Sequence, residues 1–120
     1  MRPTLIALFI IGAALYSVSA AGQQATEQYI PIGESPGLSG SDTYLGEILS
    51  VETAEHAFFV DGPDGLMRVA VSPQTRIYLD RSGVGESNSI GHYANCEAGR
   101  LVEVLLAPDG TAAWVKVLEN

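Results

Sequence analysis

The chain has 120 residues, of which 14 are acidic and 6 are lysine or arginine, so its formal net charge is −8. This length allows one domain of ordinary size. The acidic balance argues against nucleic acid and anionic membrane surfaces as partners, because both attract basic proteins. A single cysteine, Cys96, excludes an intrachain disulfide and a cysteine-based zinc or iron–sulfur site.

Residues 1–20 have the layout of a signal peptide. A basic start is followed by an apolar stretch over residues 5–16, and the small residues Val18 and Ala20 precede a cleavage site before Ala21. An uncleaved anchor is the alternative, but a spanning helix needs roughly 20 apolar residues, more than this stretch supplies. We therefore expect export to the periplasm or the medium, with no membrane span after cleavage.

Residues 21–43 are predicted to form an arm that precedes a domain at residues 44–120. The arm is rich in proline, glycine and serine, which oppose both helix and central strand. Tyr29, Ile30 and Ile32 are its apolar cluster and could dock on the domain. The alternative is a disordered terminus.

From residue 44 onward, short β-branched and aromatic runs alternate with turn signals. The segments Gly62-Pro63-Asp64-Gly65 and Pro108-Asp109-Gly110 predict tight turns. Together with the preceding Asp61, the first of them has two carboxylates, but it lacks the remaining ligands of a calcium loop. Strands are predicted at residues 44–52, 56–61, 66–71, 75–79, 101–106 and 111–118, and a long loop at 80–95.

Alternating apolar residues over 67–79 fit either one bent strand that crosses Pro73 or two strands joined by a turn. In the first strand the alternation breaks between Ile48 and Val51, which predicts a β-bulge near Leu49 that curves the strand. Short strands with one long loop predict an all-β fold, a small antiparallel five- to six-stranded barrel. The predicted core consists of Ile48, Val51, Phe58, Val60, Met67, Val69, Val71, Ile77, Leu79, Val102, Val104, Leu106, Val115 and Val117.

Three strand motifs give the chain a family resemblance. They are Gly-x-Ile-x-x-Val at residues 46–51, Val-x-x-x-Thr-x-Ile at 71–77 and Gly-x-x-Val-Glu-Val at 99–104. With these motifs, residues 44–118 resemble a group of small exported bacterial domains of unknown function whose barrel is similar to an OB-fold. The motifs consist of turn glycines and core valines, so the resemblance implies a fold and no activity.

His92 and Cys96 are four residues apart, a spacing that puts both on one side of a helical turn. An imidazole and a thiolate could bind zinc or copper, and Glu97 could add an oxygen ligand. Three converging ligands are not evident, so we predict no cofactor. Cys96 could instead pack as a small apolar side chain, or form a Cys96-linked dimer in an oxidising compartment.

The chain has no Gly-x-Ser-x-Gly nucleophile elbow and no evident group of nucleophile, base and orienting residue. We therefore expect a binding or interaction module rather than an enzyme. The alternative is a metal- or redox-linked periplasmic protein that uses His92 and Cys96.

Several aromatic and basic residues have the strand parity opposite to the predicted core. A barrel face of this kind could bind an envelope protein, a peptide or a glycan by stacking and strand pairing. In the alternative interpretation the arm covers these aromatic residues as a lid. The predicted ligand-binding residues are Phe59, Tyr78, Trp114, Arg68 and Lys116.

Overall fold

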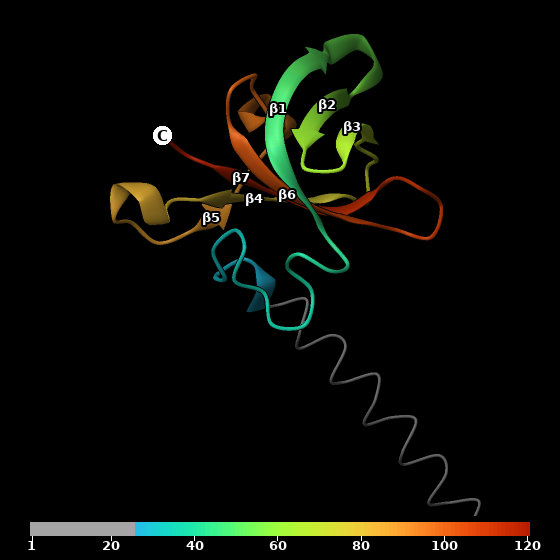
Figure 1. Cartoon of the computed structure of the whole chain (residues 1–120). Helices are drawn as coiled ribbons and strands as arrows, with labels where there is room; N and C mark the ends of the chain where they lie inside the picture. The colour runs from blue at the N-terminus through green and yellow to red at the C-terminus, as the bar shows by residue number, and fades with distance from the viewer. Residues whose placement is uncertain (1–25) are drawn as a thin grey trace, which may run out of the picture.

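The structure, a computed structural model, describes residues 26–120. The strands of this part of the chain form one mixed β-sheet (Figure 1). Its strands are β1 (Tyr44–Glu52), β2 (Ala57–Gly62), β3 (Gly65–Ala70), β4 (Arg76–Asp80), β5 (Ser89–Ile90), β6 (Leu101–Leu106) and β7 (Ala112–Leu118). In the described part of the chain these seven strands lie in the order β3-β2-β1-β6-β7-β4-β5. Short 3-10 turns are formed by η1 (Thr53–Glu55), η2 (Ser82–Val84) and η3 (Tyr93–Asn95).

The all-β class is confirmed, but the predicted antiparallel barrel of five to six strands is wrong. The sheet ends at β3 and β5 and does not close, and β4 pairs with β7 in parallel. β5 has only two residues, which leaves little strand to meet β3 across the opening. A turn, not a bent strand, joins β3 to β4: the Thr75 backbone N–H donates to the Ser72 carbonyl at 3.1 Å.

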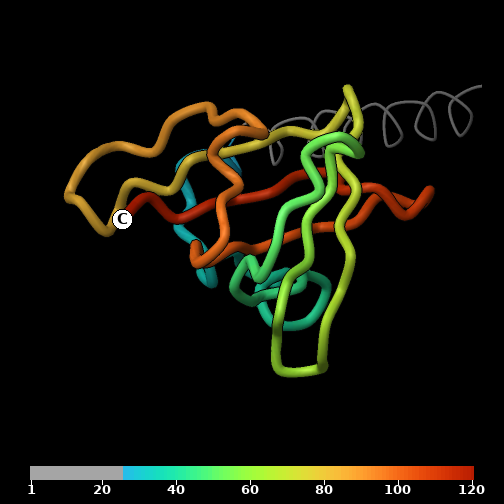
Figure 2. Tube along the Cα trace, turned by 90° about the horizontal axis from the view of Figure 1, so that it is seen from above, coloured from blue at the N-terminus to red at the C-terminus, as the bar shows by residue number. Residues whose placement is uncertain are grey.

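The predicted β-bulge at Leu49 is confirmed. Ile48 is opposite Val60 and Ser50 is opposite Phe59, so Leu49 is an extra residue in β1. The first half of β1 pairs with β6 and the second half with β2. The resulting bend lets β2 and β3 fold back over the rest of the sheet, and in Figure 2 their hairpin extends toward the bottom of the view while the loop that follows β4 extends to the left.

The hydrophobic core lies between β1–β2–β3 on one side and β4, β6 and β7 on the other. Leu106 was predicted to belong to it but is exposed, because the β6–β7 register shifts beside it and Ala112 enters the core instead. Leu79 is half-buried, and Val51, Met67 and Val71 pack on the edge of the core. The core cluster consists of Ile48, Phe58, Val60, Val69, Ile77, Cys96, Val102, Val104, Ala112, Val115 and Val117.

Residues 26–43 lie against β4, β6 and β7 on the face opposite to β2 and β3 (Figure 1). We call this segment the arm. The predicted signal peptide at residues 1–20, and residues 21–25 of the predicted arm, fall outside the described residues. Within residues 26–120, no helix has the length and apolar character needed to cross a bilayer.

Candidate functional site

The residues predicted to form one aromatic face are divided between two parts of the curved sheet. Tyr78 is opposite Lys116 on β4 and β7, and Trp114 precedes Lys116 by two residues on the same strand. Phe59 is opposite Arg68 on β2 and β3. Partners in register share a face, so the structure forms two separate groups from the five residues.

The group on β4 and β7 is covered by the arm. Tyr78, Trp114 and Lys116 are all buried. The Lys116 ammonium lies 4.7 Å from the centre of the Trp114 ring and donates to Glu27 Oε1 at 2.8 Å and to Ser35 Oγ at 2.9 Å. Ser35 Oγ in turn donates to Glu27 Oε1 at 2.6 Å. This part of the predicted face is therefore not open to a ligand.

A buried carboxylate beside Lys116 holds the middle of the arm. Glu103 of β6 is opposite Lys116 of β7. Its Oε1 accepts from the Gly33 backbone N–H at 3.0 Å, and its Oε2 accepts from Ser39 Oγ at 2.6 Å and Thr43 Oγ1 at 2.7 Å. These donors compensate a charge that burial would otherwise make costly.

Asp80, at the end of β4, fixes another point of the arm. Its Oδ2 accepts from the Ile32 backbone N–H at 2.8 Å, and its Oδ1 accepts from the N–H and hydroxyl of Ser82. The lid interpretation therefore describes the arm, but polar contacts rather than Tyr29 attach it, since Tyr29 is 65% exposed.

Burial under the arm raises the pKa of Tyr78.

The second group lies on a face that the arm leaves open. We define the β1–β3 outer face by Glu47, Leu49, Phe59, Asp61, Leu66, Arg68 and Leu101. One row across the strands is Leu101, Glu47, Asp61 and Leu66. Leu49, Leu66 and Leu101 are 59%, 56% and 48% exposed, and Phe59 is half-buried beside them. Exposed apolar side chains that form a patch rimmed by polar residues are found at protein contact surfaces.

The charges of this face are only partly paired. Arg68 contacts the Glu52 carboxylate at 3.2 Å, and this hydrogen bond raises the pKa of Arg68. Glu47 and Asp61 are direct cross-strand partners, and within residues 26–120 neither forms an ion pair. The centre of the face therefore carries two adjacent negative charges.

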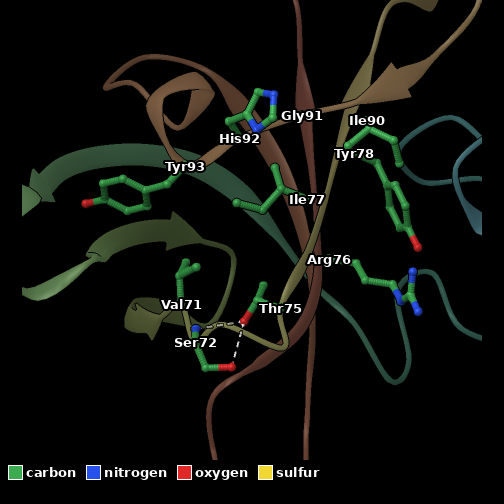
Figure 3. A pocket seen from close by; sticks show the side chains of 10 residues that line it. All are labelled: Val71, Ser72, Thr75, Arg76, Ile77, Tyr78, Ile90, Gly91, His92 and Tyr93. Atoms are coloured by element: carbon green, nitrogen blue, oxygen red, sulfur yellow. Dashed lines mark hydrogen bonds between the residues drawn. The ribbon is translucent and has the colours of Figure 1, made fainter.

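Two hollows flank the Tyr93 side chain near the opening of the sheet. The first is about 350 Å³ and includes Ile77, Tyr78 and His92 in its lining (Figure 3). Figure 3 shows Tyr78 pointing to one side of β4 while Ile77 and Tyr93 lie on the other, so its polar groups do not converge. The second is about 380 Å³ and is lined by Cys96. The Tyr93 hydroxyl donates to the Ala57 carbonyl at 2.9 Å. This hydrogen bond fixes the Tyr93 ring between the two hollows.

The predicted metal pair is separated by burial. His92 is exposed, whereas Cys96 is 3% exposed and belongs to the core. Desolvation raises the pKa of the Cys96 thiol to about 12, so the thiolate that a metal or a disulfide exchange needs is disfavoured. Across residues 26–120, no group of three or more His, Cys, Asp and Glu side chains could hold a metal ion.

Comparison of the chain with models of protein families, with curated proteins and with solved structures gives no match. The resemblance to small exported domains with an OB-like barrel therefore stays a prediction.

Five residues of the β1–β3 outer face are absent from the predicted binding residues: Glu47, Leu49, Asp61, Leu66 and Leu101. The sequence patterns place Leu66 and Leu101 in strands, Leu49 at a bulge and Asp61 beside a turn, and give none of them a binding role. A usable signal exists, because the tight turn fixes Gly62 opposite Gly65 and counting back places Asp61 opposite Leu66. The register of Glu47 against Asp61 depends on the bulge and is harder to count.

Proposed function

We propose that this protein is an exported, non-enzymatic interaction module that binds a protein partner through the β1–β3 outer face. Export is supported by the signal-peptide layout of residues 1–20. A binding role is supported by the absence of a catalytic motif in the sequence and by the hollow beside Ile77 and Tyr78, whose polar groups do not converge.

One observation carries the choice of this face. The arm covers Tyr78 and Trp114, whereas it does not cover Phe59, which is half-buried beside the exposed Leu49 and Leu66. The bulge turns Leu49 outward although the neighbouring Ile48 and Val51 pack in or against the core. Bulges often re-aim a side chain at functional places, and an exposed leucine has a cost in water unless a partner covers it.

Site-specific photo-crosslinking in the native host tests the proposal. A photoreactive amino acid is placed at Leu49 in the full chain, and a protein adduct of defined mass is expected after irradiation. The matched control is Val84, an exposed apolar residue in η2 that lies outside the β1–β3 outer face. Adducts from both positions alike, or from neither, would contradict the proposed binding face.

A second variant separates binding from misfolding. Leu101→Ser changes an exposed side chain at the border of the same face, so the fold should persist while the adduct formed from position 49 weakens. Circular dichroism and the urea midpoint check the fold. An unchanged adduct would mean that the partner does not contact the row of Leu101, Glu47 and Asp61.

A further inference from the structure

We infer that the β1–β3 outer face selects a protein segment with a lysine or arginine between apolar side chains, an inference that rests on the proposed function. Glu47 and Asp61 lie opposite each other on β1 and β2. Like charges directly opposite each other on neighbouring strands destabilise a sheet. In the free protein this pair therefore adds nothing to the stability of the fold. A cationic group of a partner would relieve the repulsion.

No cation of the described chain is available for these two carboxylates. Arg68, on the same face, is held by Glu52. In residues 26–120, Arg81 pairs with Glu86 and Glu119, Arg100 pairs with Glu97, and Lys116 is buried against Glu27. Arg76 lies on β4, in the group of strands that the arm covers. Within residues 26–120 the pair therefore has no cationic partner, and the cation of a bound protein segment would supply one.

The surroundings of the pair suit a long basic side chain. A hollow of about 140 Å³ is lined by Glu47, Ile48, Leu49 and Asp61. Exposed leucines lie at both ends of the row, Leu101 beside Glu47 and Leu66 beside Asp61. The methylene stem of lysine or arginine packs on such apolar surface while its charged end reaches a carboxylate.

Other occupants fit less well. A second copy of the chain seated on the same face would bring four carboxylates together, and the whole chain carries a net charge of −8. A divalent cation would have only two carboxylates, since residues 26–120 contain no group of three acidic, histidine or cysteine side chains around one point. A basic, apolar segment satisfies both the charge and the leucines.

The test uses the full chain and two synthetic peptides. One has a lysine between two leucines with Ser-Gly flanks, and the other has glutamate in place of lysine. Binding is followed by backbone-amide NMR shifts at millimolar peptide. We expect shifts of Glu47, Leu49 and Asp61 with the lysine peptide only, and weaker binding when NaCl rises from about 50 to about 300 mM.

Charge variants decide the selectivity. The double variant Glu47→Gln/Asp61→Asn should weaken binding of the lysine peptide about five- to tenfold, whereas Glu34→Gln, an exposed carboxylate on the arm, should leave it unchanged. The charge-reversed pair Glu47→Lys/Asp61→Lys should prefer the glutamate peptide. Both double variants must keep the wild-type shift pattern of the core.

The outcomes separate the two proposals. Equal binding of both peptides at this face would overturn the charge selectivity and leave the proposed function standing. No shift on this face with either peptide, or shifts confined to other strands, would overturn the selectivity, while the crosslinking experiment judges the proposed function independently. Shifts of Glu47 and Asp61 with calcium chloride alone at micromolar concentration would identify a metal site instead and overturn the inference.

Discussion

Lys116 on the last strand donates a hydrogen bond to Glu27 in the arm across 2.8 Å, although the two residues are 89 positions apart. Both side chains are buried, and Ser35 bonds to both. This ion pair closes one outer face of the sheet. The face that the arm leaves uncovered is the β1–β3 outer face, on the other part of the same sheet.

Removing the anion of the pair should release the arm. Glu27→Gln removes the carboxylate that Lys116 contacts directly, and breaking a buried ion pair in this way costs about 3–5 kcal/mol when the charge cannot escape. If the arm undocks, Lys116 reaches water. We therefore expect the arm to undock, and the loss of folding stability to be smaller than this cost. Trp114 is the single tryptophan and is buried under the arm, so acrylamide quenching of its fluorescence should rise severalfold. Glu34→Gln, on the exposed side of the arm, should leave quenching unchanged.

Stability should fall with rising pH because of Cys96. Its folded pKa is raised from 9.0 to about 12 by burial. The contribution of the Cys96 thiol to the free energy of unfolding is therefore complete below about pH 9. It is lost as the pH rises toward 12, because the thiol ionises at a lower pH in the unfolded chain than in the folded protein. At about pH 10 the loss is on the order of 1 kcal/mol. Urea unfolding of the wild type and Cys96→Ser at several pH values measures it; parallel pH profiles would contradict this origin.

The same burial predicts slow thiol chemistry. In the folded protein at neutral pH, reaction of Cys96 with a thiol reagent should be far slower than in urea, because the thiol is buried and protonated. Non-reducing electrophoresis of protein oxidised without denaturant should show no reducible dimer. A reducible dimer from native protein would mean that the segment around η3 opens readily.

A side chain at Gly46 should destabilise the fold. A Cβ there would lie 2.5 Å from the Asp61 carbonyl oxygen and 2.7 Å from Val60 Cγ1. The Asp61 carbonyl cannot withdraw without disturbing the β1–β2 ladder, and Val60 is fully buried in the core, so Gly46→Ala should cost about 1–3 kcal/mol in urea unfolding. Gly83→Ala is the matched control, since its Cβ would meet nothing closer than 3.6 Å. Equal effects of the two substitutions would contradict the close strand contact.

Relief of the like-charge pair should stabilise the free protein. Glu47→Gln or Asp61→Asn removes one of two opposed carboxylates and should raise stability by about 0.2–1 kcal/mol at low salt. The gain should shrink at high salt, because exposed charges are screened. Urea midpoints at two salt concentrations measure it. A loss of stability at low salt would show that the two carboxylates support the fold and are not held in repulsion.

Local sequence was enough to place most strands. The turn at Gly62–Gly65 and the apolar alternation on either side of it predicted β2 and β3 within a residue at each end. The break at Leu49 predicted the bulge because two core residues three apart cannot both face inward on a regular strand. The two-residue strand β5 was missed because it has too few residues to show any alternation.

The candidate site depended more on distant contacts. Parity correctly put Trp114 and Phe59 away from the core, because alternate side chains of a strand point to opposite faces. It could not tell that the arm covers one and leaves the other half-buried, since that difference comes from Glu27, Glu103 and Asp80 binding groups far away in the chain.

The sequence by itself determined the strands, the turns and the inward or outward side of most residues, because these follow from interactions within a few residues. Only the tertiary structure decided the open sheet, the parallel pairing of β4 with β7 and the face that stays accessible. The physical reason is that hydrogen bonds between strands and the burial of Lys116 need partners that are brought together only when the whole chain folds.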